Sequence, residues 1–471
     1  MPRSRSLGII VGGGPAPGIN GVIGAASINA INHGFSVRGF YDGFSWLSSE
    51  KFDRQQHSVE LEIPDVARIH FDGGSILRTA RTSLLDKSTV DEHSRVIPDA
   101  AKVGNVLRNL ERCGVTHLIT IGGDDTALSA RFVAEASGGK IRVVHVPKTI
   151  DNDLPVPSDL PTFGFNTARH FGAELVANLM EDSRTTGRWY FVVAMGRNAG
   201  FLAMGIGKAA AATLTLIPEE FPGHTTISNI VDVLEGAILK RRAMGRPDGV
   251  AVIAEGLAYR LGDVDELAQL LGKEVPVDAA GHPRLSEFPL DEILKREVAK
   301  RFKQRGDSVT IVSETMGYEL RCARPTPFDM AYCRDLGHGA VTLLLEDDRS
   351  QGGVMVTIHG GDLRPVTFEE LIDPETNRTR VRQVELNTTP YLVARSYMIR
   401  LEPGDFESRQ SLERIAAQAK LTADEFAARY KHVVDESFVK LPPSLARSQV
   451  VQVMDEPIES HRCDASKLLP M

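Results

Sequence analysis

The sequence contains few of the residues that would place it in several common protein classes. Its four cysteines, Cys113, Cys322, Cys333 and Cys463, form no C-x-x-C pair, so neither a zinc site nor a disulfide framework is expected. Only 6% of residues are aromatic, which argues against a surface that stacks nucleic-acid bases. The formal net charge of -8 offers no general attraction to nucleic acid or to anionic membranes.

Long hydrophobic runs are also absent from the sequence. The first apolar run, residues 7–11, stops at glycines and is too short for a signal-peptide core or a membrane span. We therefore expect a cytoplasmic protein whose partners are neither membranes nor nucleic acids. At 471 residues the chain is too long for one ordinary domain, and its 42% hydrophobic and 25% charged residues are typical of globular proteins.

Glycine, in contrast, is abundant, at 42 residues, as expected of a chain with many strand-to-helix turns. Seven short apolar runs have the character of strands that are buried on both faces, as in parallel sheets. These runs are residues 7–11, 117–121, 143–146, 190–194, 213–217, 250–254 and 308–312. Helix-like stretches such as 19–31 and 126–136 lie between them. Strands that alternate with helices predict a layered α/β fold.

Two segments depart from this alternation. Residues 259–304 are strongly charged and are interpreted as an insertion with helical parts. From about residue 402 the chain becomes polar and helix-like, which predicts a helical C-terminal extension.

Two glycine-rich segments follow predicted strands. Residues 11–20, VGGGPAPGIN, open a helix, and glycines there let backbone amides approach an anion closely. A simple tight turn is an equally good interpretation of this segment alone. Residues 121–126, IGGDDT, lie at the end of another strand, where ligands bind in open α/β sheets. Asp124 and Asp125 could hold Mg²⁺ there, or could merely cap the following helix.

A third segment, residues 146–153 (VPKTIDND), concentrates charge at a strand end. An aspartate at this place can accept the proton of an attacking hydroxyl. The neighbouring Lys148 can offset the charge of a transferring phosphoryl group. We prefer this interpretation to that of a polar turn.

These segments resemble those of the phosphofructokinase family. GGDDT (122–126), PKTIDND (147–153) and MGR (195–197) occur in the order and spacing of that family. The opening GGPAPGIN (13–20), the loop GGSILRTAR (73–81), and the segments AEG (254–256) and GYELR (317–321) are also similar to it. The resemblance extends from residue 8 to about residue 335.

The resemblance implies two Rossmann-like three-layer domains with largely parallel sheets around a cleft. Residues 1–160 would form the phosphate-donor domain, to which the chain returns at about 320–400. Residues 161–319 would form the sugar-phosphate domain, with the insertion at 259–304, and residues 401–471 the C-terminal extension.

It also implies the roles of individual residues. Asp151 would take the proton from the 1-hydroxyl of fructose 6-phosphate, Asp153 would help to organise metal and substrate, and Asp124 would bind Mg²⁺. The residues implied to hold the sugar phosphate are Thr149, Met195, Gly196, Arg197, Glu255, Tyr318 and Arg321. Gly13 and Arg81 would contact the donor phosphates. Arg188 matches an arginine that is often lent to a neighbouring subunit, so a homodimer or homotetramer is expected.

Two charged positions bear on the phosphoryl donor. The family's ATP-dependent members typically carry glycine at the position of Asp125, and many carry glycine at that of Lys148. A carboxylate at residue 125 would stand where the α-phosphate of ATP must pass, adding bulk and like charge. Lys148 would bind pyrophosphate oxygens. The pair resembles the pyrophosphate-dependent branch, in which phosphoryl transfer runs readily in both directions.

Other functions are weighed against this prediction. An ATP-dependent phosphofructokinase shares most of the motifs, and a noncatalytic regulatory subunit would be expected to lose Asp124, Asp151 or Asp153. The glycine-rich turn around Gly12 does not contain the full glycine fingerprint of a dinucleotide-binding oxidoreductase. Sedoheptulose 7-phosphate presents the same phosphate and keto end as fructose 6-phosphate, so it stays open as an acceptor. We interpret His170 and His338 as structural residues.

Overall fold

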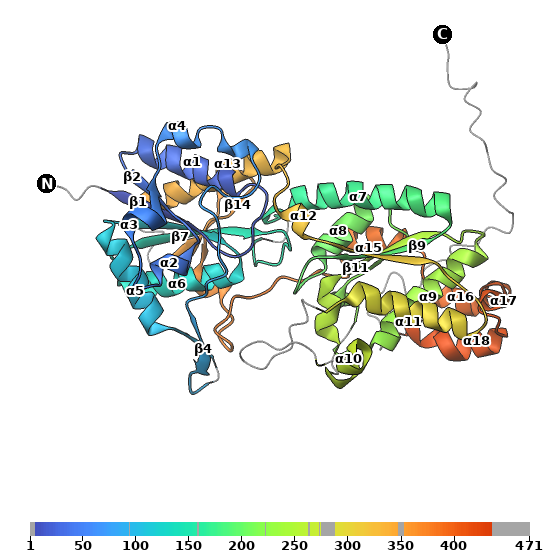
Figure 1. The fold of residues 1–471 in the computed structure, drawn as a ribbon. Helices are drawn as coiled ribbons and strands as arrows, with labels where there is room; N and C mark the ends of the chain where they lie inside the picture. Colours follow the sequence, from blue (N-terminus) through green and yellow to red (C-terminus); the bar gives the residue numbers. More distant parts are fainter. Residues whose placement is uncertain are drawn as a thin grey trace, which may run out of the picture.

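The protein folds into two lobes, each built on its own β-sheet (Figure 1). The computed structural model describes residues 5–435, except residues 94, 158–159, 222, 262–263, 273, 275–287 and 347–352. Within these described ranges, no helix combines the length and apolar character needed to cross a membrane.

The first lobe contains an eight-stranded sheet in the order β16-β13-β7-β6-β1-β2-β3, with β8 paired to β7. The pairs of β1 with β2 and β6, and of β7 with β6, β8 and β13, are parallel, whereas β3 and β16 are antiparallel to their neighbours. The strands are β1 (Ser6–Val11), β2 (Ser36–Phe40), β3 (Ser58–Glu60), β6 (His117–Gly122), β7 (Arg142–Thr149), β8 (Phe163–Gly164), β13 (Val354–Met355) and β16 (Val366–Thr367).

Helices cover both faces of this sheet. Apolar residues of α1 and α13 share one core with Ile9, Ile119 and Val144, and those of α5 and α6 share another with Ile10 and Leu118. Alternate residues of each strand thus face opposite helical layers. The helices are α1 (Ile19–Asn32), α2 (Phe44–Leu47), α3 (Arg54–His57), α4 (Ile63–Val66), α5 (Ala100–Arg112), α6 (Asp124–Ser137), α13 (Pro327–Leu345) and α14 (Phe368–Leu371), with the short 3₁₀ turn η1 (Ile69–Phe71).

The second lobe repeats this three-layer plan on a smaller, entirely parallel sheet, in the order β10-β11-β9-β12. Phe191 and Val193 of β9 pack with α9 and α11, while Tyr190 and Val192 pack with α7 and α8 on the opposite face. The elements are α7 (Phe165–Thr186), β9 (Trp189–Ala194), α8 (Phe201–Ala209), β10 (Leu214–Leu216), η2 (Pro218–Glu220), α9 (Ile227–Ala243), β11 (Gly249–Ala254), η3 (Glu255–Arg260), α10 (Val264–Leu271), α11 (Leu290–Gln304), β12 (Ile311–Met316), α12 (Tyr318–Arg321) and α15 (Thr389–Ser396).

One predicted strand was misplaced. The apolar run 308–312 predicted a strand buried on both faces, but β12 spans Ile311–Met316 and exposes Glu314 and Thr315. The reason is its position at the edge of the sheet, where one side of the strand has no neighbour and polar residues are tolerated. The other six runs lie in or overlap β1, β6, β7, β9, β10 and β11.

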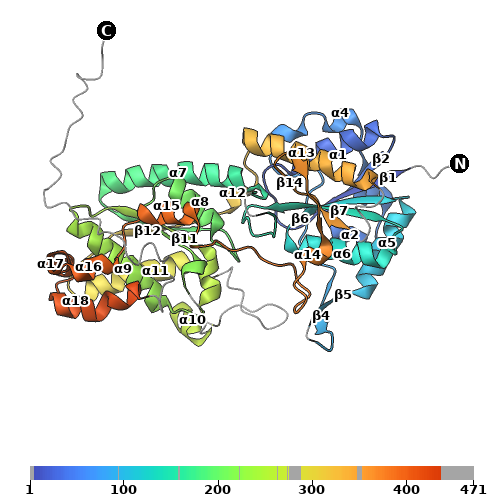
Figure 2. The same cartoon turned by 180° about the vertical axis from the view of Figure 1, so that it is seen from behind.

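The helices near the C-terminus are integrated into the second lobe. They are α16 (Pro403–Glu407), α17 (Arg409–Gln418) and α18 (Ala423–Tyr430), followed by η5 (Lys431–Val434). Ile415 and Phe426 are fully buried in the same core as α9 and α11, and Lys240 Nζ of α9 lies 2.7 Å from Asp405 Oδ2. Figure 2 shows these helices on the side of the second lobe away from the first.

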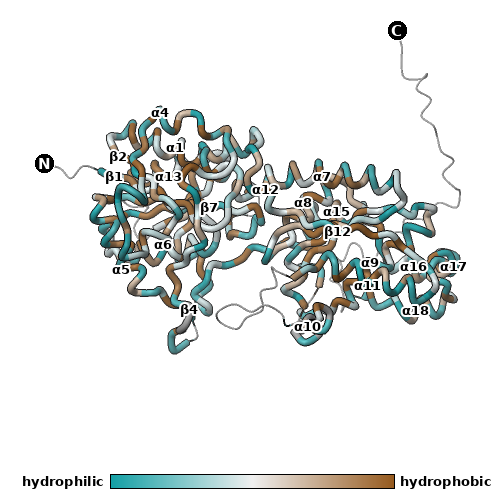
Figure 3. Tube along the Cα trace, viewed as in Figure 1, coloured by the Kyte–Doolittle hydropathy of each residue, from teal (hydrophilic) through white to brown (hydrophobic). Residues whose placement is uncertain are grey.

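Helix α11, at the end of the predicted insertion 259–304, also belongs to that core, because Leu294 and Phe302 are fully buried in it. Both segments were interpreted as additions because their sequences are rich in charged and polar residues, and the hydrophilic (teal) colour prevails along α17 and α18 in Figure 3. Residues 275–287 of the predicted insertion and residues 436–471 of the predicted extension lie outside the described residues. The domain boundaries near residues 160 and 320 stay predictions.

The described residues also form two small antiparallel sheets. One is formed by β4 (Leu85–Val90) and β5 (Val96–Pro98), the other by β14 (Ile358–His359) and β15 (Asp362–Leu363).

Candidate active site

The loops predicted to carry chemistry follow neighbouring strands. In the first sheet, β1, β6 and β7 are adjacent and parallel, so the loops after Val11, Gly122 and Thr149 emerge at the same edge. In the second sheet, β9, β11 and β12 are adjacent and parallel, and the loops after Ala194 and Met316 likewise share an edge. The two edges meet at a cavity lined by residues 13–15, 80–82, 123–126, 148–151 and 153 of the first lobe and by Arg197 and Arg321.

The glycine loop after β1 is fixed by its backbone. The amide of Gly12 donates to Ile121 O at 2.8 Å, and the amide of Gly13 donates to Ala80 O at 2.9 Å. Gly13 has φ of +83°, a left-handed conformation that favours glycine, and a Cβ there would lie 3.3 Å from Lys148 Nζ. The loop thus brings its backbone close to Lys148 at the wall of the cavity, and its role as an anion-binding loop stays a prediction.

Lys148 is the second-to-last residue of β7, and its side chain enters the cavity from the sheet. Only 4% of its surface is exposed, and its Nζ donates a hydrogen bond to Gly14 O. Burial lowers the pKa of this ammonium to about 8, although the nearby carboxylate of Asp151 partly opposes the shift. A buried ammonium of this kind is poised to bind an anion.

Asp151 and Asp153 lie in the tight loop that follows β7. The amide of Asp151 donates to Thr149 Oγ1 at 3.0 Å, and Asn152 between the aspartates has φ of +58°. Burial raises the pKa of Asp151, while the guanidinium groups of Arg197 and Arg321 hold it down. Burial, followed by the charges of Asp151 and Asp124, raises the pKa of Asp153 to about 7. Carboxylates with raised pKa values in a cleft are typical of acid–base sites.

Asp124 and Asp125 form the first turn of α6, whose N-terminus faces the cavity. Asp124 Oδ1 lies 3.8 Å from Arg197 Nη2 across the two lobes, and the Asp124 side chain is about one-third exposed, at 32%. Asp125 is exposed at the same mouth. Both carboxylates therefore face the space where a ligand would lie.

The second lobe contributes cationic and polar groups. Arg321 lies in α12 after β12, with its guanidinium carbon 4.9 Å from the Tyr318 ring centre, and Tyr318 is 76% exposed. Gly196 donates its amide to Glu255 Oε2 at 3.2 Å, which links the loop after β9 to the residue after β11. Burial raises the pKa of Glu255.

Most of the residues implied by the resemblance are thus brought together. The cavity is lined by Gly13, Arg81, Asp124, Asp125, Lys148, Thr149, Asp151, Asp153, Arg197 and Arg321. Met195, Gly196, Glu255 and Tyr318 lie beside Arg197 and Arg321 on the second-lobe side. Arg188 does not join them: it precedes β9, at the opposite edge of the sheet, with its Nε 4.0 Å from Asp182 Oδ2.

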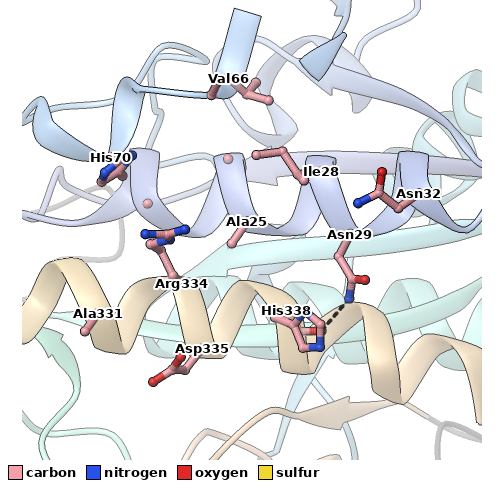
Figure 4. A pocket seen from close by; sticks show the side chains of 13 residues that line it. Ala25, Ile28, Asn29, Asn32, Val66, His70, Ala331, Arg334, Asp335 and His338 are labelled. Atoms are coloured by element: carbon pink, nitrogen blue, oxygen red, sulfur yellow. Dashed lines mark hydrogen bonds between the residues drawn. The ribbon is translucent and has the colours of Figure 1, made fainter. Parts of the chain in front are cut away.

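A larger cavity, of about 460 Å³, lies between α1 and α13 (Figure 4). Its labelled residues include His70, Arg334 and His338, and Asn29 Nδ2 donates to His338 O at 3.1 Å. We place the chemistry at the smaller cavity because only that one joins carboxylates, Lys148 and arginines at the carboxyl ends of parallel strands.

Two residues to which the sequence analysis assigned no role also shape the site, although Asn20 lies within the glycine-rich motif 13–20. Asn20, buried in α1, donates to Asp72 O at 3.2 Å and accepts from the amide of Ile76 at 3.0 Å, so that it holds the loop leading to Arg81. Arg382 contacts the Asp151 loop from a segment 230 residues away. Its isolated position in a polar stretch carries no motif that could have revealed this contact.

Comparisons with known proteins agree with these motifs. Residues 6–344 match the family model described as Phosphofructokinase. The pyrophosphate--fructose 6-phosphate 1-phosphotransferase of Thermotoga maritima is 52% identical over 92% of this chain and 99% of the relative. The protein of the same description from Naegleria fowleri is 46% identical over 91% of this chain and 96% of the relative.

More distant relatives include both donor types. The ATP-dependent 6-phosphofructokinase 2 of Clostridium perfringens is 29% identical over 80% of this chain and 94% of the relative. The fold is also that of a solved structure described as the pyrophosphate-dependent phosphofructokinase of Nitrosospira multiformis. That structure superposes with a TM-score of 0.61 at 15% identity, covering 88% of this chain and 92% of that one.

Proposed function

The chain belongs to the phosphofructokinase family, and from that premise we propose that it transfers a phosphoryl group from pyrophosphate to the 1-hydroxyl of fructose 6-phosphate. The products are fructose 1,6-bisphosphate and phosphate, and the reaction runs in both directions. The relatives with 52% and 46% identity both carry the pyrophosphate-dependent description.

The observation that carries the choice of donor is that Lys148 and Asp125 line one cavity with Asp151. Lys148 is buried beside the glycine loop and supplies a positive charge for pyrophosphate oxygens. Asp125 stands at the exposed mouth of the cavity, where a longer nucleotide would have to pass. A carboxylate there repels the additional phosphate and adds bulk, which selects the shorter donor.

The acceptor side is assigned to the second lobe. Arg197 and Arg321 present planar guanidinium groups, which suit phosphate oxygens, and Glu255 can accept hydrogen bonds from sugar hydroxyls. Asp151 lines the same cavity as the two arginines and Lys148 and senses their charges, which supports its proposed role as the group that accepts the proton of the attacking 1-hydroxyl. Holding the two substrates in line, together with electrostatic stabilisation of the transferring group, supplies most of the rate enhancement expected for such a transfer.

We propose Asp124 as the protein ligand of Mg²⁺. Among the described residues, no group of three or more His, Cys, Asp or Glu side chains forms a metal cage. This fits magnesium, which proteins commonly hold through one or two carboxylates together with substrate phosphates and water. When bound, Mg²⁺ neutralises the charge of the donor phosphates. Asp124 would hold it at the N-terminus of α6, facing the donor.

Two further features remain part of the proposal. Arg188 lies at the edge of the second sheet opposite to this chain's own site, so a role in sugar-phosphate binding requires a second subunit. We therefore propose a homodimer or homotetramer in which Arg188 acts in trans. The cytoplasm is the expected location.

A donor comparison tests the proposed function. Fructose 1,6-bisphosphate formation would be measured with pyrophosphate and, separately, with ATP at matched Mg²⁺. We expect turnover with pyrophosphate and little with ATP. Turnover with ATP alone would overturn the donor assignment, and turnover with neither donor would favour another acceptor, such as sedoheptulose 7-phosphate, or a regulatory subunit.

A further inference from the structure

We propose that Arg382 is a positioning residue that holds the Asp151 loop in the geometry needed for phosphoryl transfer, an inference that rests on the proposed function. The residue lies in the segment between β16 and α15, more than two hundred residues from that loop in sequence. None of its contacts was indicated by a motif.

The guanidinium of Arg382 binds several parts of the loop at once. Its Nε donates to Asn152 O at 3.2 Å, and its Nη2 donates to the Asn152 side-chain oxygen Oδ1. Its Nη1 lies within hydrogen-bonding distance of three further carbonyl oxygens, those of Val156, Pro157 and Leu160, of which Leu160 O is the nearest, at 2.9 Å. The backbone amide of Arg382 donates to Asp153 O at 2.8 Å. Arg382 therefore binds the loop both before Asp153, at Asn152, and after Asp153, at the three carbonyl oxygens.

Asn152 explains why the loop needs such support. This residue lies between Asp151 and Asp153 and has φ of +58°, a conformation that costs free energy for a residue other than glycine. Its Oδ1 also accepts the amide of Thr162 at 2.9 Å. Because Asn152 is only 7% exposed, water cannot readily replace Arg382 at this oxygen. Arg382 thus stabilises the turn that sets the directions of both aspartates.

The same segment also reaches the second-lobe side of the site. The amide of Val384 donates to Glu219 Oε1 at 3.0 Å, and the same oxygen accepts the amide of Gly200 at 2.9 Å. Gly200 ends the loop 195–200, which contains Arg197, and it precedes Phe201, whose ring lies 5.2 Å from the Arg382 guanidinium carbon. Residues 382–384 therefore connect the loop of the proposed base with the loop of the proposed sugar-phosphate arginine.

The chemistry of arginine suits this task. Its planar guanidinium carries five donors in a fixed fork and remains charged, so it can bind several carbonyl oxygens and an amide oxygen at once. Lysine offers a single ammonium group, which cannot reproduce that geometry. The contacts to Asn152 and Leu160 should therefore be specific for arginine at this position.

The test compares Arg382→Gln and Arg382→Lys with a matched control, Arg380→Gln. Arg380 lies in the same segment and also donates from Nε to a carbonyl, Ile372 O at 3.2 Å, but this contact is outside the Asp151 loop. We expect Arg382→Gln to lower kcat about 10- to 100-fold, as misplaced catalytic groups do, with KM for fructose 6-phosphate changed less than about threefold. Arg382→Lys should recover part of kcat, and Arg380→Gln should stay within about twofold of wild type.

A second measurement does not depend on turnover. Amide hydrogen exchange of residues 150–156 should become faster in Arg382→Gln and remain unchanged in Arg380→Gln, since the loop opens locally when its donors are lost. The proposal would be overturned by equal kcat values in Arg382→Gln and Arg380→Gln, or by unchanged exchange of the loop. It would also be overturned if Arg382→Gln raised KM for fructose 6-phosphate and left kcat unchanged.

The outcomes separate this proposal from the proposed function. Wild-type enzyme that turns over with ATP alone would contradict the donor assignment, whereas the exchange of the Asp151 loop would still report on Arg382. Active wild type with an unaffected Arg382→Gln variant would leave the proposed function intact and remove the positioning role. If Arg382→Gln does not fold, Arg382→Lys supplies the same comparison.

Discussion

The two sheet edges that meet at the candidate active site differ in how far the side chains that we assign to function are exposed to solvent. On the first-lobe side, Lys148 and Asp153 are only 4% and 7% exposed, and burial shifts their pKa values. On the second-lobe side, the Arg197 side chain is 46% exposed and Tyr318 is 76% exposed.

This difference indicates a division of work. Lys148 and Asp153, to which we assign parts in the transfer itself, are held at the first edge, where they cannot be solvated freely. Arg197 and Tyr318, which we propose to bind the sugar phosphate, are open to solvent until a ligand covers them. Changes at the first edge should therefore act mainly on kcat or on the donor, whereas changes at the second edge should act mainly on KM for fructose 6-phosphate.

The largest effect is expected for Asp151→Asn. The amide retains the shape of the carboxylate but cannot accept the proton of the 1-hydroxyl, so kcat should fall by about 10² to 10⁴-fold. KM for fructose 6-phosphate should change little. Steady-state kinetics with pyrophosphate would measure both, and a thermal unfolding curve would show that the variant is folded. A change confined to KM would contradict the assignment of Asp151 as the base.

The next largest effect is expected for Lys148→Gln. Loss of the buried ammonium removes the charge that binds the donor, so kcat/KM for pyrophosphate should fall by about 10² to 10³-fold. KM for fructose 6-phosphate serves as the internal control, because the sugar-phosphate arginines are unchanged. If both substrates lost affinity equally, the variant would have disturbed the whole site, and the difference between the two edges would not hold.

At the second edge, Arg321→Gln is expected to raise KM for fructose 6-phosphate by about 10- to 100-fold, the loss typical of a charge-assisted hydrogen bond to phosphate. The kcat value should change by less than the KM value. Arg324→Gln is a suitable control, because Arg324 lies nearby but does not line the active-site cavity. A drop in kcat with unchanged KM would mean that Arg321 acts in the transition state.

A smaller effect is expected for Asp125→Gly, which removes bulk and negative charge from the mouth of the cavity. The ratio of kcat/KM for ATP to that for pyrophosphate should rise by about tenfold or more, since repulsion of a longer donor disappears. The ratio would be measured at matched Mg²⁺, and Asp125→Asn separates charge from size. No change in the ratio for either variant would show that selection of the donor lies elsewhere.

Much of the site was predictable because its residues directly follow apolar strands. Asp124 lies two residues after the end of β6, Lys148 is the second-to-last residue of β7, and Asp151 lies two residues after the end of β7. Adjacent parallel strands bring such positions together at one edge of the sheet. Contacts between distant, polar segments were not predictable. The hydrogen bond of Arg382 to Asn152 spans 230 residues, and the helices α11 and α17 enter the core through narrow apolar faces in otherwise charged sequence.

The pH dependence of the activity tests the first edge only, because the two titrating groups considered, Asp151 and Lys148, both lie there. Asp151 must be unprotonated to act as a base, and its raised pKa moves the acid limb of kcat/KM above the range of an ordinary carboxylate. Lys148, with a pKa of about 8, loses its charge as pH rises, so the alkaline limb of kcat/KM for pyrophosphate should lie near that value.

Bound pyrophosphate places negative charge beside this ammonium and raises its pKa, so the alkaline limb of kcat should lie at higher pH than that of kcat/KM. At pH values just above 8, the relative loss of kcat should be a few-fold smaller than the relative loss of kcat/KM. Pyrophosphate itself also ionises in this range, and Lys148→Arg is the matched control because its guanidinium stays charged. If wild type and Lys148→Arg had the same alkaline limb, that limb would come from ionisation of the substrate. This result would contradict the titration of Lys148.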